Sequence, residues 1–167
     1  MGQVKKIKVA LICHFSTAEV RSHLPLDSRK LYAFMRKLLR MPTKGNTYGD
    51  IASWNTGLIE YLSSREDVEL HVISAHSGLK RMLYSFSSNN VHYYFVKADF
   101  STLLKRIIPN DSLWRKLNPM RFVVSKVVKD ISPDIVNLIG AENAYISGTI
   151  LDIKDYPIFV LCQTIYN

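Results

Sequence analysis

The segment that most constrains the fold is residues 133–143, with the sequence PDIVNLIGAEN. Its residues 135–139 are mostly apolar, and the run stops at Gly140. A strand buried on both faces of a parallel sheet shows such a continuous apolar run, because helices cover both sides. Ligand sites in these sheets lie beyond the carboxyl ends of the strands. The segment therefore predicts a buried strand that leads through a permissive glycine to Glu142, at the mouth of a binding site.

Four further segments are rich in β-branched, aromatic or other apolar residues. They predict strands at residues 7–14, 69–75, 91–98 and 157–165. Helices are expected at residues 24–41, 50–64, 100–108, 118–131 and 144–153. Alternating strands and helices favour a parallel sheet with right-handed crossovers. We therefore expect one α/β domain with a Rossmann-like parallel sheet, strand order 3-2-1-4-5, and helices on both faces.

Two of these helices carry apolar stripes that are expected to pack on the sheet. The stripe of the helix at residues 50–64 consists of Ile51, Trp54, Leu58, Tyr61 and Leu62, with Asp50 as the N-cap. The helix at residues 118–131 is expected to turn inward Phe122, Val123, Val127 and Ile131.

Composition places the chain among globular proteins. Its 167 residues are 47% hydrophobic, which suffices for the core of one ordinary domain. No apolar run reaches the roughly 20 residues that span a bilayer, and residues 1–8 lack the features of a secretory signal, so a cytoplasmic location is expected. Cys13 and Cys162 lie in apolar runs without metal-binding spacing, which predicts buried thiols and no metal site. The predicted order separates them by two strands, roughly 10 Å, too far for a disulfide.

The formal net charge of +8 favours an anionic partner. Basic residues concentrate in two segments, residues 29–40 and 105–121. Such segments can bind an anionic membrane surface or a protein partner. An equal alternative is that their charged side chains only face solvent. Nucleic acid is a weaker candidate, because most aromatic residues fall at strand positions that are expected to be buried.

The predicted strand order brings several polar or conformationally permissive residues to one edge of the sheet. His14 ends the first strand, and a loop with two glycines, residues 44–49, precedes the helix that begins at Asp50. Backbone N–H groups of a loop at a helix start suit phosphate or sugar hydroxyls, although no GxGxxG or Walker pattern is present. With Gly140 and Glu142, these residues predict a binding rim. The alternatives are that His14 only ends a strand and that Glu142 only caps a helix.

The succession KVALICH, a glycine-bearing loop, GLIEYLSSREDVELHVIS and ISPDIVNLIGAEN resembles the N-terminal half of retaining group 1 glycosyltransferases of the GT-B fold. The resemblance covers nearly the whole chain and is most telling at residues 57–74 and 133–143. It implies two Rossmann-like domains that face a cleft, of which residues 1–167 form a truncated N-terminal domain without the C-terminal donor domain. No cofactor is then expected in this chain, and the nucleotide-sugar donor belongs to the missing domain.

The resemblance also implies roles for single residues. The family has a glycine pair in the loop after the first strand; Gly49 matches one member and Tyr48 stands in place of the other. Many members have a histidine just after the glycine of the fourth strand, where this chain has Glu142. Glu142 is therefore the expected catalytic residue. The expected substrate-binding residues are His14, Tyr48, Gly49, Asp50, Gly140 and Asn143, and no metal is expected.

Two functions follow as hypotheses. The first is the acceptor-binding domain of a glycosyltransferase that moves a sugar from a nucleotide-sugar to a glycan or lipid-linked acceptor at the inner membrane face. The chain alone is then expected to be inactive, because its partner is the missing donor domain. The alternative is a non-enzymatic Rossmann-like module that binds an anionic partner through its basic helices.

Overall fold

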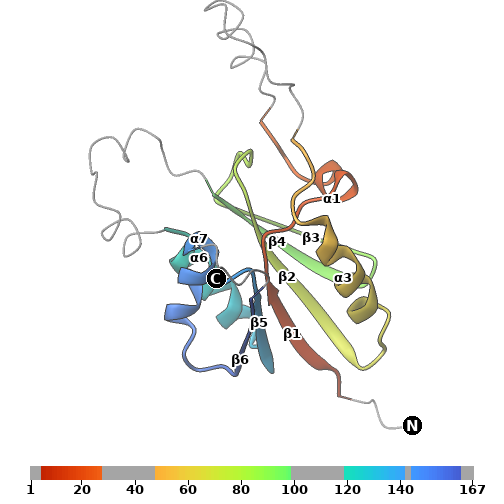
Figure 1. Cartoon of the computed structure of the whole chain (residues 1–167), viewed down its shortest axis with the longest axis vertical. Coiled ribbons are helices and arrows are strands. Elements are labelled where there is room, and N and C mark those ends of the chain that lie inside the picture. The colour runs from red at the N-terminus through yellow and green to blue at the C-terminus, as the bar shows by residue number, and fades with distance from the viewer. Residues whose placement is uncertain (1–4, 28–47, 99–118, 142–143, 163–167) are drawn as a thin grey trace, which may run out of the picture.

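The computed structural model describes residues 5–27, 48–98, 119–141 and 144–162, and a six-stranded sheet lies at its centre (Figure 1). The strand order is β3-β4-β2-β1-β5-β6. The strands are β1 (Ile7–Ile12), β2 (Val68–His76), β3 (Leu83–Ser88), β4 (Val91–Lys97), β5 (Ile135–Ile139) and β6 (Ile158–Leu161). The helices are α1 (Ala18–Ser22), η1 (Ser53–Asn55), α3 (Thr56–Ser63), α6 (Pro119–Ile131), α7 (Ala144–Ser147) and η2 (Gly148–Asp152), where η marks a 3₁₀-helix.

The sheet confirms an α/β fold that is mostly parallel, but the prediction of an all-parallel sheet of five strands was wrong, because a sixth strand adds an antiparallel edge and changes the strand order. The five expected strands occur as β1, β2, β4, β5 and β6, and they pair with one another in parallel. β3 is an additional edge strand, antiparallel to β4. Asn89 and Asn90 join the two strands with φ angles of 50° and 61°. A two-residue turn with two positive φ angles matches the twist of a hairpin, which explains the antiparallel pair.

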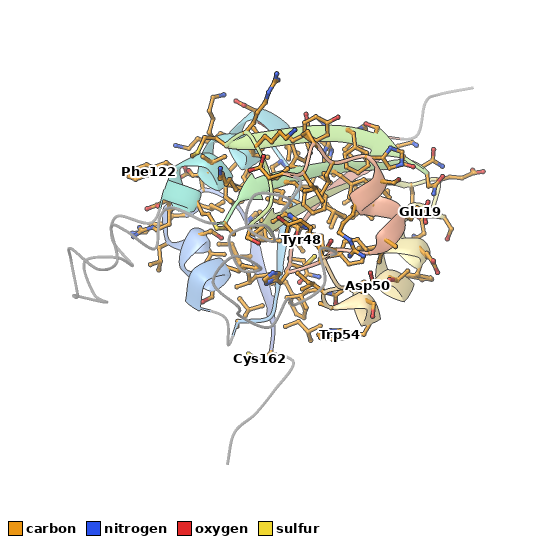
Figure 2. All side chains as sticks on the ribbon, turned by 90° about the horizontal axis from the view of Figure 1, so that it is seen from above. Glu19, Tyr48, Asp50, Trp54, Phe122 and Cys162 are labelled. Carbon is orange, nitrogen blue, oxygen red and sulfur yellow. The ribbon has the colours of Figure 1, made fainter. Side chains whose placement is uncertain are left out.

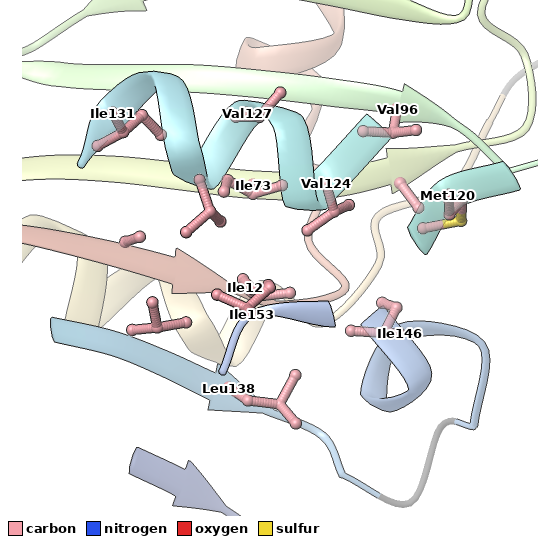
Figure 3. Close-up of a cluster of buried hydrophobic side chains, with 14 residues drawn as sticks. Ile12, Ile73, Val96, Met120, Val124, Val127, Ile131, Leu138, Ile146 and Ile153 are labelled. Atoms are coloured by element: carbon pink, nitrogen blue, oxygen red, sulfur yellow. The ribbon is translucent and has the colours of Figure 1, made fainter. Parts of the chain in front are cut away.

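Helices cover both faces of the sheet. On one face, α6, α7 and η2 bury Val124, Val127 and Ile153 against Ile12 of β1 and Leu138 of β5 (Figure 3). On the other face, α1 and α3 pack on β1, β2 and β4, with Val20 and Ile59 in the centre of that core. Successive residues of each central strand therefore point alternately into two separate hydrophobic cores.

The predicted inner faces of two helices were partly wrong. Trp54, Tyr61 and Phe122 are 69%, 59% and 68% exposed. α3 begins only at Thr56, after η1, and its buried face centres on Ile59. Tyr61 follows Ile59 by two residues, as Val124 follows Phe122, and two residues turn an α-helix by about 200°. These aromatic side chains therefore point to solvent.

The two cysteines differ. Cys13 is fully buried, and this burial raises the pKa of its thiol to about 12. Cys162 is exposed, so the prediction of a buried thiol was wrong for this residue. It directly follows β6, the edge strand, where Phe159 and Leu161 are also exposed. Both cysteines are free thiols.

The remaining helices agree with the sequence only in part. α6 begins at Pro119 and ends at Ile131, as expected. The expected helix at residues 144–153 is instead a short α-helix followed by a 3₁₀-helix. α1 was not expected; Thr17 caps it by accepting a hydrogen bond of 3.4 Å from the N–H of Val20. The expected helix at 100–108 and most of that at 24–41 lie outside the described residues, as do most residues of the two basic segments.

Within the described ranges, no helix has the length and apolar character needed to cross a membrane.

Candidate functional site

The candidate site lies where the connections change from one face of the sheet to the other. The connection from β1 to β2 runs through α3 on one face, and the connection from β4 to β5 runs through α6 on the opposite face. β1 and β5 are neighbours, so the change of face falls between them. In open α/β sheets, ligands bind at this switch point, beyond the carboxyl ends of the strands.

His14, which follows β1, and Gly140, which follows β5, lie on the two sides of this switch point. Ile12 of β1 faces Leu138 of β5, and His14 and Gly140 each lie two residues further along. Gly140 has a φ of 87°, a left-handed conformation that a side chain would strain. Its N–H donates a hydrogen bond of 3.1 Å to the carbonyl of Leu161, which fixes the turn against β6.

His14 is half-buried, and this burial lowers the pKa of its imidazole. The side chain is therefore neutral near pH 7, with one ring nitrogen as a donor and the other as an acceptor. The backbone immediately after it is fixed by β2. The hydroxyl of Ser74 accepts from the N–H of Phe15 and donates to its carbonyl, both at 2.9 Å.

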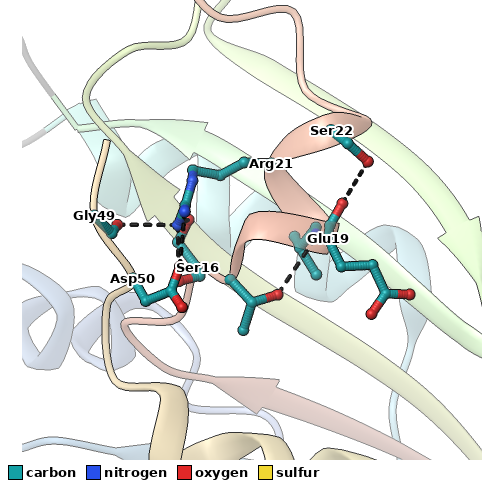
Figure 4. Close-up of polar contacts among 8 residues, drawn as sticks. Ser16, Glu19, Arg21, Ser22, Gly49 and Asp50 are labelled. Carbon is teal, nitrogen blue, oxygen red and sulfur yellow. Dashed lines mark hydrogen bonds and ion pairs between the residues drawn. The ribbon is translucent and has the colours of Figure 1, made fainter. Parts of the chain in front are cut away.

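An arginine clasp fastens the Gly49 loop to the chain that leaves β1. The guanidinium of Arg21 lies 2.7 Å from a carboxylate oxygen of Asp50 and donates to the carbonyl of Gly49 at 2.9 Å (Figure 4). It also donates to the carbonyl of the buried Ser16 at 3.2 Å. Two backbone hydrogen bonds between Ser16 and Ile51, of 2.8 and 2.9 Å, complete the attachment. The clasp therefore holds Gly49 and Asp50 beside the carboxyl end of β1.

The clasp corrects two expectations about this loop. Asp50 does not cap a helix, because its carboxylate pairs with Arg21. The loop also does not run directly into a helix start, because the Ile51 bridge and η1 separate Gly49 from α3. The N–H of Ile51 is already bonded to Ser16, so it is not open to a phosphate.

Ala52 follows the clasp in a left-handed conformation, with φ 46° and ψ 44°. A non-glycine residue in this region costs roughly 1–2 kcal/mol. Such strain persists only where the surroundings enforce it, and it concentrates at functional sites. Here the bridge between Ser16 and Ile51 fixes the preceding residue, and η1 begins at the next one.

Tyr48 lies over the carboxyl end of β2. Its ring meets the ring of His76 edge-on, with the centroids 4.7 Å apart. A Cβ atom added to Gly78 would clash with the hydroxyl and the ring of Tyr48, so the tyrosine packs directly on this glycine. The N–H of Gly78 donates to Nδ1 of His76 at 3.1 Å. The Tyr48 side chain therefore covers the carboxyl end of β2, a position that a second glycine in the loop would leave uncovered.

Glu142 and Asn143, the expected catalytic residue and its neighbour, lie outside the described residues. His14 and Gly140 lie beyond the carboxyl ends of the paired strands β1 and β5, and the clasp holds Gly49 and Asp50 near Ser16, two residues after His14. Tyr48 lies at the neighbouring end of β2. Sequence reasoning missed Ser16, Arg21, Ser74 and His76. Ser74 and His76 could have been found, because they lie at the carboxyl end of the strand predicted at residues 69–75. Nothing local in the sequence marks Arg21 as the partner of Asp50.

A broad hollow lies elsewhere among the described residues. It has a volume of about 880 Å³ and is lined by residues that include Arg65, Asp67, Asn89 and Asn90, at the amino ends of β2 and β4. It is broad and open, and the Arg65 and Asp67 side chains that line it already pair with each other at 2.7 Å. We favour the carboxyl edge, because the switch point, a half-buried neutral histidine and a strained backbone lie at that edge.

In the described part of the chain, no three histidine, cysteine or acidic side chains are grouped so that they could hold a metal ion. No protein-family model matches the sequence, and neither the curated proteins nor the solved structures include a match.

Proposed function

We propose that the chain is the acceptor-side domain of a retaining glycosyltransferase with GT-B architecture. In this proposal the enzyme transfers a sugar from a nucleotide-sugar to a glycan or lipid-linked acceptor. The observation that carries it is the position of His14 and Gly140 at the switch point between β1 and β5, with the clasped Gly49 loop held near Ser16, beyond the carboxyl end of β1. The resemblance of the sequence to group 1 enzymes supplies the reaction class, and the net charge of +8 suits an acceptor that carries phosphate.

Each residue has a role in the proposal. The neutral imidazole of His14 exchanges hydrogen bonds with acceptor hydroxyls. Gly140, which has no side chain, lets the acceptor approach the backbone. Glu142, two residues later, is the proposed catalytic residue and orients a hydroxyl group, with Asn143 beside it in sequence. Asp50 and Gly49 are proposed to bind substrate from the clasped loop, and Tyr48 to form the adjoining wall.

The reaction joins the acceptor oxygen to the anomeric carbon of the donor sugar, breaks the bond from that carbon to the diphosphate, and releases the acceptor proton. The donor belongs to a second domain, and the rate depends on positioning and on the exclusion of water between two walls. This chain offers one wall. It should therefore bind acceptor weakly, should bind nucleotide-sugars poorly, and should not transfer sugar.

Calorimetry on the isolated chain tests the proposal. The chain is titrated with UDP-glucose, UDP-N-acetylglucosamine and GDP-mannose, and donor hydrolysis is measured in parallel. We expect no saturable heat at micromolar ligand and no hydrolysis. Micromolar nucleotide binding or measurable turnover would contradict the domain assignment, and a self-sufficient Rossmann-like enzyme would then explain the site better.

A further inference from the structure

A short turn between β2 and β3 presents two basic and two apolar side chains in succession. These residues are Lys80, Arg81, Met82 and Leu83, and all four are exposed. Met82 and Leu83 are 41% and 37% exposed. The turn projects beyond the sheet at the end where β2 stops and β3 begins (Figure 1). We call residues 80–83 the β2–β3 tip.

The tip is held in place by the chain on either side of it. Leu79, the preceding residue, is fully buried in the core under α1 and α3. The N–H of Lys80 donates to the carbonyl of Pro25 at 3.3 Å. The carbonyl of Met82 accepts a hydrogen bond of 2.9 Å from the N–H of Lys97, at the end of β4. A loop that is already ordered loses little conformational entropy on binding, so the tip is preorganised for contact with a partner.

The charge around the tip is positive. Lys97, whose N–H bonds to the tip, adds a third cation to Lys80 and Arg81. Asp27 brings one carboxylate near, because its N–H donates at 2.8 Å to the residue two positions before Lys80. Within the described part of the chain, none of these four side chains forms an ion pair. The cations of the tip are therefore open to an anionic partner.

We propose that the β2–β3 tip docks on an anionic lipid bilayer. On such a surface, apolar side chains enter the boundary between headgroups and acyl chains, and neighbouring basic side chains bind the lipid phosphates. Met82 and Leu83 supply the apolar contact, and the two preceding residues supply the charge. The tip has no aromatic ring on which a nucleobase could stack, which favours lipid over single-stranded nucleic acid. The net charge of +8 adds long-range attraction to an anionic surface.

The tip adjoins the proposed acceptor site. Tyr48 packs on Gly78, two residues before the tip. In the view onto this end of the sheet, Tyr48 lies near the middle of the molecule (Figure 2). A bilayer bound at the tip would therefore lie beside the wall that Tyr48 forms. The inference does not depend on the proposed transferase function, because binding to lipid is measured without donor or acceptor.

Sedimentation of the full chain with vesicles tests the proposal. The vesicles contain phosphatidylcholine with or without phosphatidylglycerol, at low and at high salt. We expect binding to the anionic vesicles alone, and weaker binding at high salt. Lys80→Gln and Arg81→Gln should each weaken binding about fivefold. A double Met82→Ser, Leu83→Ser variant should weaken it about tenfold, because two apolar side chains no longer leave water.

The control for net charge is a double Lys126→Gln, Lys129→Gln variant. Both lysines are exposed in the second half of α6, which ends near the amino end of β1, at the opposite edge of the sheet. This variant should bind like the parent chain. The basic segments at residues 29–40 and 105–121 stay unchanged in every variant, so a difference in affinity reports the tip.

A fluorescent label reports insertion of the tip. In a Leu83→Cys, Cys162→Ser variant, the thiol at the tip is the accessible one, because Cys13 is fully buried. An NBD group on this thiol should shift its emission to the blue with anionic vesicles. The same label in a Tyr61→Cys, Cys162→Ser variant should not shift, because Tyr61 lies near the end of α3 that leads to the amino end of β2.

Three results would overturn the proposal: tip variants that bind vesicles as tightly as the parent chain, equal weakening by the lysine control, or equal binding to neutral vesicles. Absence of the blue shift at the tip, while the chain still sediments with vesicles, would place the lipid contact elsewhere and overturn it too. Loss of the blue shift when single-stranded RNA of equal total charge is added would assign the tip to nucleic acid instead.

Discussion

His14 and Gly140 follow the carboxyl ends of two neighbouring strands, each two residues beyond the facing pair Ile12 and Leu138. A half-buried histidine and a left-handed glycine therefore flank the switch point of the sheet. The clasp formed by Arg21 brings the Gly49 loop to the same end of β1. The proposed acceptor site rests on this arrangement.

The clasp should be measurable as stability. Arg21 is only 13% exposed at its side chain, and Arg21→Met removes its bonds to Asp50, Gly49 and Ser16. Because Asp50 is half exposed, we discount the ion pair and expect a loss of about 1–2 kcal/mol in the free energy of unfolding. Urea denaturation gives this value, and hydrogen exchange at the Ile51 amide should become faster. Arg65→Met, which breaks an exposed pair with Asp67, is the control and should change little.

Alanine substitutions at two glycines should change the free energy of unfolding in opposite directions. Gly78→Ala places a methyl group against the ring of Tyr48 and should cost about 1–3 kcal/mol through overpacking. Gly57→Ala, inside α3 with open space around it, should stabilise the chain by about 0.5–1 kcal/mol. Thermal or urea denaturation of both variants gives the comparison.

A double variant tests whether the Gly78→Ala substitution destabilises the chain through its clash with Tyr48. In a Tyr48→Ala background, Gly78→Ala should lose most of its cost, because the clashing ring is gone. If the cost of Gly78→Ala is the same with and without Tyr48, the packing of the tyrosine on this glycine is not what the substitution disrupts.

Stability should fall as the pH drops below about 6.5, the ordinary pKa of histidine. Burial lowers the pKa of His14, and burial and the neighbouring His92 lower that of His71 despite its bond to Glu69. The unfolded chain therefore binds more protons than the folded chain in acid, which favours unfolding. Urea denaturation at pH 7.5, 6.5 and 5.5 measures the slope. His71→Gln should make it shallower, and an unchanged slope would exclude His71 as a source.

The two thiols should react at different rates with Ellman's reagent. Cys162 is exposed and should react at once in the folded chain. Cys13 is fully buried with its pKa raised to about 12, so it should react only on unfolding. The number of cysteines that react before and after the addition of urea gives the result. Two fast thiols in the native chain would mean that the core around Cys13 opens easily.

The sequence was informative wherever a residue's neighbours in the chain decide its structure. The apolar run at residues 135–139 predicted a buried strand, and Pro119 predicted the start of α6. β3 also carried a signal that was overlooked. Its exposed and half-buried positions alternate, and the Asn89–Asn90 pair suits a two-residue hairpin turn.

Other features depend on contacts between distant residues. Arg21 and Asp50 are separated by 29 positions, and no local pattern pairs them. The phase of α3 depends on η1 and on the strained Ala52, so the exposure of Trp54 could not be deduced from helical spacing alone. In the proposal, Glu142 and a second domain select the substrate, and no local sequence pattern identifies that substrate.

The measurement that tests the central claim most directly is an NMR titration of the ¹⁵N-labelled chain with a prenyl-diphosphate-linked saccharide, compared with free prenyl diphosphate and with UDP-glucose. We predict shifts at the amides of His14, Gly49 and Gly140 with the linked saccharide, which Glu142→Gln should weaken without lowering the melting temperature. Prenyl diphosphate should shift these amide resonances less, and UDP-glucose should not shift them. Shifts confined to other surfaces, or an equal response to UDP-glucose, would contradict an acceptor site at this edge of the sheet.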